Sequence, residues 1–429
     1  MRLRGSVLPF LLVAAATAQT PIAEAAKIAH QRAERAQQRP RLLEPFLADL
    51  SAEYEANKVS LQPRIAAVVA LGPDVVPELL ERLQPAQQND ANRHLAANCR
   101  LALQQFDLSD HFGCLVDFAA GGNDTARNEA IRLLGHVGVP AAAPLLTELL
   151  DHTQGESRRL VLGALGEQRA AAAAPKVATM LASADRNLRG DALACLTAIG
   201  SEAVVETVRA ALLAEKENKL LPSYVEFFAA TTRENAAVTR DLLPLLSRDR
   251  TNWRDTKRLV EVLATIAPRD HEPTIRNLTE IITSGEINHL GLQAAITLQA
   301  LGDRNGLPRL RRAVDEQLRK PARRTEAALY ELRGQIGFAT EDYTEALADF
   351  ERALTMAGDT ASMARQAHIG MMRCEARKKR IVNLTKLMKS SGMTVAEIEA
   401  IGESDAVFHE TLQQDKVRAF LAKLATETK

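Results

Sequence analysis

The sequence predicts an all-α fold, an α-α superhelix of stacked helix pairs, and three observations point to it. A phrase of small residues ending in Leu-Gly or Ile-Gly returns along the chain, so that Leu134, Leu165 and Ile199 each lie one repeat apart. Apolar residues recur every three or four positions around it, which is helical spacing. Aromatic residues make up only 4% of the chain, as expected of helices packed through Ala, Leu and Val. A period of 31 to 36 residues is typical of helical solenoids.

The phrase has five clear copies and three weaker ones, which together give eight units. The clear copies are ALG at 70–72, LLG at 133–135, ALG at 164–166, AIG at 198–200 and ALG at 300–302. The weaker copies lie near Leu103, Ala230 and Ile266. In each unit a first helix ends near the Gly, and Gly166 and Gly200 are expected to adopt the left-handed conformation that terminates a helix. A second helix follows almost at once, often with Pro in its first turn.

Residues 1–18 have the composition of a cleaved signal peptide. Arg2 and Arg4 form a basic start, a short apolar segment runs from residue 6 to 15, and small residues follow at 16–18. We therefore expect an exported protein, periplasmic or secreted, that is cleaved after Ala18. The apolar segment is too short to cross a bilayer, and no later segment is long and apolar enough, so no transmembrane segment is expected.

Four regions follow this leader. Residues 19–64 are rich in Ala, Gln, Glu and Arg and are predicted to form an N-terminal helical cap, with two helices over 22–57, because an uncapped repeat exposes an apolar face. Residues 65–320 contain the eight repeats. A different helix-pair pattern begins after Pro321 and covers 325–391, and residues 392–429 are predicted to form a C-terminal helical cap.

Within 65–320, the units from Arg158 to Ala182 and from Leu188 to Leu213 resemble the HEAT-like repeat, in its phycobilisome-lyase-type form. That pattern has an Asp in the turn between repeats, an Arg that opens the first helix, and then Ala-Leu-Gly. The matching residues of this chain are Asp124, Arg127, Arg158, Asp185 and Arg189. The resemblance implies a structural ladder in which Asp and Arg side chains hydrogen-bond neighbouring repeats. The repeats from 215 to 285 lose both the Arg and the Gly.

The segment from Tyr330 onward resembles a tetratricopeptide repeat. The residues that carry this resemblance are Tyr330, Gly334, Gly337, Tyr343, Ala346, Phe350 and Ala353. That family places small residues where two antiparallel helices touch and aromatic residues where the next pair packs. A second, degenerate unit is expected from Ser362 to Ser391, so the solenoid is predicted to continue into tetratricopeptide-like helix pairs.

No catalytic, cofactor-binding or metal-binding pattern accompanies the repeats. The nine histidines form no zinc-hydrolase motif, and the sequence has no C-x-x-C, no phosphate-binding loop and no G-x-S-x-G turn. We therefore expect no catalytic residues, no cofactor and no metal. Cys99 and Cys114 fall on consecutive predicted helices, where both a disulfide and two buried thiols fit the sequence.

One charge cluster stands out from a chain whose formal net charge is zero. Between residues 304 and 333 nine basic residues face four acidic ones, a local net charge of +5. The candidate binding residues are Arg309, Arg311, Arg312, Arg319, Lys320, Arg323 and Arg324. Two interpretations remain open: a basic groove that receives an acidic peptide or another anionic ligand, and a solvated helix face. The neutral net charge argues against nucleic acid as a partner.

The predicted function is that of an exported, non-enzymatic scaffold or adaptor that presents a concave helical surface to a protein or peptide partner. The alternatives are a lyase-like or chaperone-like HEAT-repeat protein that acts on a partner protein, and a binder of an anionic cell-envelope ligand. The scaffold is favoured because no acid–base or cysteine cluster marks a reaction site.

Overall fold

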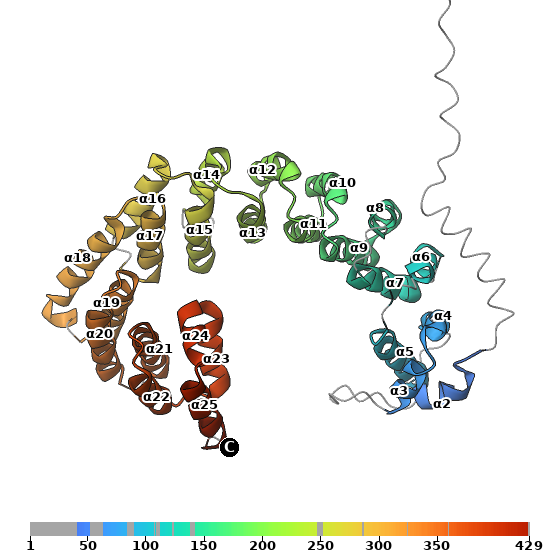
Figure 1. The fold of residues 1–429 in the computed structure, drawn as a ribbon. Helices are drawn as coiled ribbons and strands as arrows, with labels where there is room; N and C mark the ends of the chain where they lie inside the picture. Colours follow the sequence, from blue (N-terminus) through green and yellow to red (C-terminus); the bar gives the residue numbers. More distant parts are fainter. Residues whose placement is uncertain are drawn as a thin grey trace, which may run out of the picture. The chain divides into compact units, whose positions relative to one another are not determined.

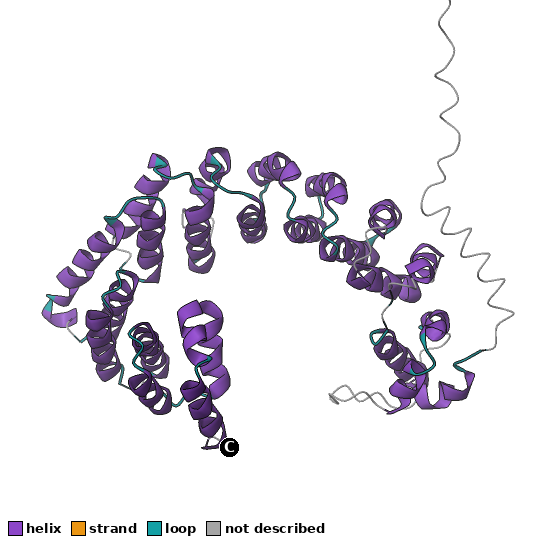
Figure 2. Ribbon diagram, viewed as in Figure 1, coloured by secondary structure: helices purple, strands orange, loops and turns teal. Residues whose placement is uncertain are grey.

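The computed structural model describes residues 41–51, 63–83, 90–106, 108, 112–121, 124–137, 142–246, 252–284, 287–323, 325–358 and 360–427. Within these ranges every regular element is a helix, and consecutive helices pack against each other (Figures 1 and 2). The prediction of an all-α superhelical fold is confirmed. The predicted signal peptide at 1–18 lies outside the described residues, as does most of the segment expected to form helices over 22–57. No helix in the described ranges is both long and apolar enough to span a bilayer.

The chain divides into two compact units, Met1–Thr231 and Thr232–Lys429. The division falls where the sequence repeat is weakest. The first unit contains α2 (Leu47–Leu50), α3 (Pro63–Val69), α4 (Val76–Glu81), α5 (Asp90–Leu103), α6 (Phe112–Gly121), α7 (Asp124–Val137), α8 (Ala142–His152), α9 (Gly155–Glu167), α10 (Ala174–Thr179), α11 (Arg186–Ile199), α12 (Val205–Ala214) and α13 (Leu221–Thr231).

The second unit contains α14 (Ala236–Leu242), α15 (Trp253–Ile266), α16 (Glu272–Thr283), α17 (His289–Ala300), α18 (Gly306–Leu318), α19 (Ala327–Ala339), α20 (Tyr343–Met356), α21 (Ala361–Arg377), α22 (Ile381–Ser390), α23 (Val395–Ser404), α24 (Ala406–Leu412) and α25 (Asp415–Glu427). Short 3-10 turns lie between or extend these helices: η1 (Glu44–Phe46), η2 (Pro73–Val75), η4 (Ala171–Ala173), η5 (Met180–Ala182), η6 (Glu202–Val204), η7 (Asn218–Leu220), η8 (Leu243–Leu246) and η9 (Pro321–Arg323).

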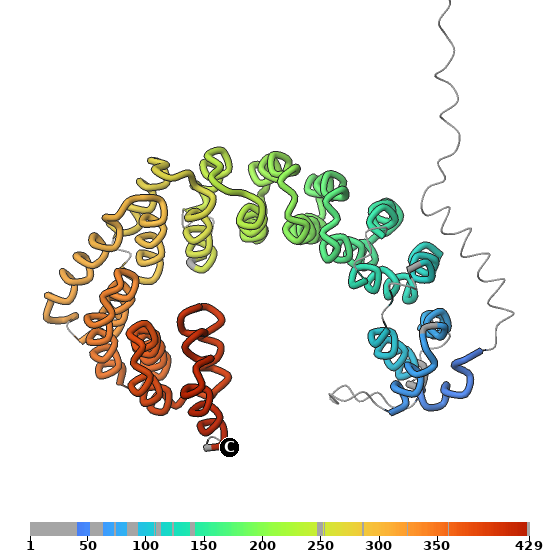
Figure 3. Tube along the Cα trace, viewed as in Figure 1, coloured from blue at the N-terminus to red at the C-terminus, as the bar shows by residue number. Residues whose placement is uncertain are grey.

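In the first unit the helices form two rows. Helices α7, α9, α11 and α13 pack on one another in succession, and α6, α8, α10 and α12 alternate with them along the chain (Figure 3). Each helix buries an apolar stripe: in α9, Val161, Leu162 and Leu165 are buried, whereas Glu156 and Arg159 are exposed. We call the series α5, α7, α9, α11 and α13 the odd row.

The glycine of the recurring phrase has two different structural roles. Gly200 ends α11 with a φ of 69°, as predicted. Gly166 lies inside α9, so the prediction that it terminates that helix is wrong. A Cβ on Gly166 would lie 3.1 Å from the Cβ of Ala198, and one on Gly135 would lie 2.8 Å from the Cα of Ala164. Gly135 and Gly166 therefore allow successive helices of the odd row to approach closely.

The turn inside a helix pair keeps a left-handed residue even where Gly is missing. The residues that do this have φ between 45° and 63°, and they are Arg169, Glu234, Asp270, Glu341 and Lys379. The Asp270 amide donates to the carbonyl of Leu301 at 3.1 Å, and the Glu234 amide donates to the carbonyl of Thr265 at 3.3 Å. Each of these two turns is thus held by the end of the next odd-numbered helix. The turn geometry therefore persists in residues 215–285, where the sequence phrase is lost.

In the second unit, α15, α17, α19 and α21 pack in succession. One apolar core runs from Val260 in α15 through Leu310 in α18 to Ile336 in α19. The change of sequence pattern at Pro321 corresponds to the short turn η9, and the core continues across it. The helices before and after Pro321 are therefore one packed stack.

Small residues stand where α19, α20 and α21 meet. Phe350 of α20 is fully buried between two glycines. A Cβ on Gly334 would lie 2.8 Å from the Phe350 ring, and one on Gly370 would lie 2.5 Å from it. These two positions accommodate the ring only because they lack a side chain.

The last helices share a further core with α21 and α22. Met372 and Leu384 are buried together with Phe408 of α24 and with Val417 and Leu421 of α25. The segment from residue 392 is therefore packed on the helix pair that precedes it.

Candidate functional site

The predicted ladder residues make contacts of different kinds. Asp124 and Arg127 pair within α7, with 3.0 Å between Arg127 Nη1 and Asp124 Oδ1. Asp185 caps α11 by accepting the Asn187 amide at 2.9 Å. Arg158 lies in α9, and its buried Nε has no hydrogen-bond partner among the described residues. These four residues therefore do not link neighbouring repeats through printed Asp–Arg contacts of their own.

Arg189, the fifth ladder residue, links α11 to the turn that precedes α13. Its Nε and Nη2 atoms donate to the two carboxylate oxygens of Glu215 at 2.9 Å each. The Glu215 side chain is only 2% exposed, and it also accepts from the Tyr224 hydroxyl at 3.4 Å. Burial opposes ionisation, but hydrogen bonds from Arg189 and from backbone amides outweigh it and hold the pKa of Glu215 below its usual value. The carboxylate is therefore charged and fully used inside the stack.

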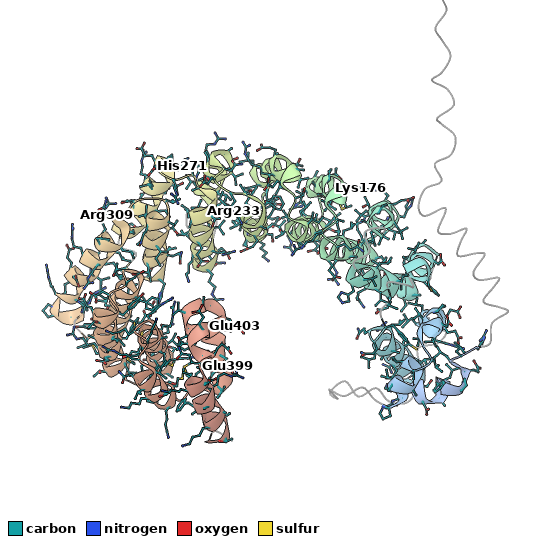
Figure 4. All side chains as sticks on the ribbon, in the orientation of Figure 1. Lys176, Arg233, His271, Arg309, Glu399 and Glu403 are labelled. Carbon is teal, nitrogen blue, oxygen red and sulfur yellow. The ribbon has the colours of Figure 1, made fainter. Side chains whose placement is uncertain are left out.

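The basic cluster predicted from the sequence lies on α18 and in the turn after it. Figure 4 labels Arg309 near the start of α18, where its guanidinium lies 3.4 Å from Asp303. Arg311 pairs with Glu345 of α20. Arg312, Arg319, Lys320 and Arg323 are exposed. Lys320 donates to the side chain of Gln317 at 3.1 Å, and Arg323 lies 3.6 Å from Glu326. Arg324 lies outside the described residues.

Carboxylates from outside the 304–333 window reduce its charge surplus. Arg333 donates to both oxygens of the buried Asp349, at 2.8 and 2.7 Å, and to Asp315 at 2.9 Å. The hydrogen bonds from Asp349 raise the pKa of Arg333. Asp349, Glu345 and Asp303 all lie outside the window, and counting them lowers the local surplus from +5 to +2. Much of the cluster thus holds α18, α19 and α20 together.

A comparable buried carboxylate joins α21 to α24. Asp405 is 1% exposed and accepts from Arg373 Nε at 2.7 Å and from Arg377 Nη2 at 3.0 Å. It also caps α24 by accepting the Phe408 amide at 3.1 Å. Burial opposes its ionisation, but these hydrogen bonds prevail and lower the pKa of Asp405.

Sequence reasoning missed this pairing, although a signal was present. Arg373 and Asp405 are 32 residues apart, and so are Arg365 and Glu397, which pair at 2.6 Å. An Arg followed by a carboxylate about one repeat later is the pattern that marks these inter-repeat contacts.

An open cleft of about 260 Å³ lies on the odd row of the first unit. Three helices from consecutive pairs line it, through Arg100 of α5, Thr125, Asn128, Glu129 and Arg132 of α7, and Glu156 of α9. The Glu129 side chain is only 3% exposed and lies between two arginines, 2.8 Å from Arg132 Nη1 and 3.6 Å from Arg100 Nε. The sequence gave no sign of this cleft, because Arg100 and Glu156 are almost two repeats apart.

A second cleft, of about 280 Å³, lies at the turns of the second unit. Arg233, which Figure 4 labels, and Arg269 line it, each directly before the left-handed residue of its turn. Arg233 donates to the carbonyl of Thr232 at 2.7 Å. This cleft follows from the turn geometry that successive repeats share.

The described residues offer no cluster of metal ligands and no activated thiol. They contain no group of three or more His, Cys, Asp or Glu side chains placed to hold a metal ion. Cys99, Cys195 and Cys374 are buried free thiols whose pKa values burial raises to about 12. Cys114 is also a free thiol, so no disulfide joins it to Cys99. Thiols with raised pKa values are poor nucleophiles.

No protein-family model matches the sequence, and no curated protein matches it either. The candidate function therefore rests on the contacts described above.

Proposed function

We propose that the protein is an exported, non-enzymatic scaffold that binds a partner protein on the odd row of its first unit. In this proposal the helix pairs over 65–320 are HEAT-like repeats and those over 325–391 are tetratricopeptide-like. The observation that supports it best is the cleft formed by α5, α7 and α9. Three consecutive pairs contribute to it, so the surface is a product of the stacking itself, as in other helical-repeat binding proteins.

The buried ion pairs support the same function because they hold the stack in one arrangement. Arg189 and Glu215 do so in the first unit, and Arg333 and Asp349 do so in the second. A surface that is already ordered loses little conformational entropy when a partner binds.

Crosslinking in intact cells tests this function. The full-length chain with a C-terminal tag is crosslinked, purified and analysed by mass spectrometry. A scaffold is expected to yield the same protein partner in every replicate, in an amount comparable with its own. Recovery of nothing beyond what an untagged strain yields would contradict the proposal.

Binding of an anionic envelope ligand is a second candidate, favoured by the exposed basic residues of α18 and its following turn. Arg312 is exposed and makes no printed ion pair or hydrogen bond in the described part of the chain. The double variant Arg312→Glu/Lys320→Glu leaves the Arg311–Glu345 contact in place. It is expected to abolish binding to phosphatidylglycerol vesicles if this candidate is correct, and equal binding of the variant would exclude it.

A further inference from the structure

We propose that Arg100 and Arg132 form a clamp for the carboxylate side chain of an Asp or Glu in the partner protein. Glu129 acts as the positioning residue of this clamp. The inference rests on the proposed scaffold function and names the chemistry that the odd row recognises.

The first argument is the way in which Glu129 holds the two arginines. Its carboxylate is 3% exposed and contacts Nη1 of Arg132 at 2.8 Å and Nε of Arg100 at 3.6 Å. The arginine side chains themselves are 47% and 44% exposed. Each guanidinium has five N–H donors in a rigid plane, so most of its donors remain for another acceptor. Because Glu129 fixes these planes, a bound carboxylate meets donors that are already ordered.

The second argument is the charge balance of the cleft. The Glu156 carboxylate at its edge is taken up by Arg159, at 2.7 Å. Arg100, Arg132 and Arg159 therefore outnumber Glu129 and Glu156 by one positive charge. An anionic group that enters the cleft is attracted by this surplus and finds no competing free carboxylate.

The third argument is the size and the lining of the cleft. Its volume of about 260 Å³ is below the range of about 300–1,000 Å³ typical of pockets for drug-sized ligands. It suits one side chain of an extended segment rather than a cofactor. Asn128 accepts from the Ser157 hydroxyl at 2.7 Å through Oδ1, which leaves its Nδ2 group to donate. Leu160 adds an apolar contact for the methylene groups of the incoming residue.

The test starts from a phage-displayed library of random dodecapeptides selected against the full-length protein. Enriched peptides are expected to carry Asp or Glu at one fixed position. Affinities of the synthetic peptides are then measured by fluorescence anisotropy. Replacement of the fixed acid by its amide, or the protein variant Arg132→Glu, is expected to weaken binding about tenfold or more, the size expected for a charge-assisted hydrogen bond.

Matched variants separate the clamp from general charge and from misfolding. Arg312→Glu changes an exposed arginine of the other unit and is expected to leave the affinity unchanged. Arg132→Lys keeps the charge but loses the planar fork, so its loss is expected to lie between those of Arg132→Glu and Arg312→Glu. Circular dichroism checks the fold of each variant.

Three results would overturn the clamp. They are enriched peptides without a fixed acid, equal affinity of wild type and Arg132→Glu, and equal affinity of wild type and Arg132→Lys. If the cellular partner still crosslinks to Arg132→Glu as it does to wild type, the scaffold function stands and only the clamp is wrong. If wild type crosslinks to no partner, the scaffold function itself fails.

Discussion

Arg189 donates two hydrogen bonds, each 2.9 Å long, to the buried carboxylate of Glu215 in the following part of the stack. The contact joins α11 to the turn before α13, and Tyr224 closes its far side. A buried ion pair stabilises a fold only while both partners are present, because a single buried charge is costly. The integrity of the first unit therefore depends on this pair.

Glu215→Gln is expected to lower the free energy of unfolding by about 2–4 kcal/mol, because it leaves the Arg189 guanidinium without its charged partner. Denaturation in urea, followed by circular dichroism, measures the change. The matched control is Glu206→Gln, since Glu206 is 71% exposed and pairs with Arg209 on the surface of α12. The control is expected to cost less than about 1 kcal/mol. Equal effects of the two variants would show that the buried pair has no special role.

The contribution of Glu215 is expected to depend on pH. Its pKa in the folded protein is lowered from the usual 4.5, so the unfolded chain binds the proton more tightly. The stabilisation is fully present above the unfolded value and is lost as the pH falls through the folded value. The difference in stability between wild type and Glu215→Gln should therefore shrink as the pH falls below about 4.5. A constant difference from neutral pH down to about 3 would contradict this assignment.

Gly370→Ala is expected to destabilise the second unit by about 1–3 kcal/mol, because the new methyl group would overlap the Phe350 ring. The matched control is Gly163→Ala in α9, where a Cβ meets nothing within 4 Å. That control is expected to be neutral or to stabilise by up to about 1 kcal/mol, because Ala favours a helix over Gly. Thermal melting of the two variants checks the order, and Phe350→Leu in the Gly370→Ala background should restore part of the loss. An unchanged melting temperature for Gly370→Ala would rule out the tight contact.

Export is expected to remove the first 18 residues. The protein purified from its native cells should start at Gln19 and should be found in the periplasm or the medium. N-terminal sequencing and the intact mass determine this directly. Arg2→Glu/Arg4→Glu should retain the uncleaved chain in the cytoplasm, because the basic start of the leader is lost. A mature protein that begins at Met1 would contradict the predicted leader.

The fold was predictable from the sequence because its signals are local. The period of the Leu-Gly phrase and the helical spacing of apolar residues both depend on neighbours within one helix pair. The two roles of Gly166 and Gly200 were not predictable, because one depends on the approach of Ala198 from the next repeat. Turns such as that at Asp270 were hidden because a non-glycine residue adopts the left-handed conformation there.

The candidate site was predictable only in part, because charges pair across repeats. The sequence identified the arginines of α18 but not the carboxylates Glu345 and Asp349 that pair with this region from α20. It likewise gave no reason to single out Glu129, whose importance comes from Arg100 on another helix. A charge count over a window of the sequence therefore overestimates the charge that a stacked repeat presents to a partner.

The central claim is that the odd row of the first unit is the surface that binds a partner protein. Site-specific photo-crosslinking in native cells tests it most directly. A photoreactive phenylalanine is placed at Gly163, which is exposed on α9, and as a matched control at Thr179, which is exposed at the end of α10. The account predicts one discrete crosslinked protein from position 163 and none from position 179. The same yield from both positions, or a product from 179 alone, would contradict it.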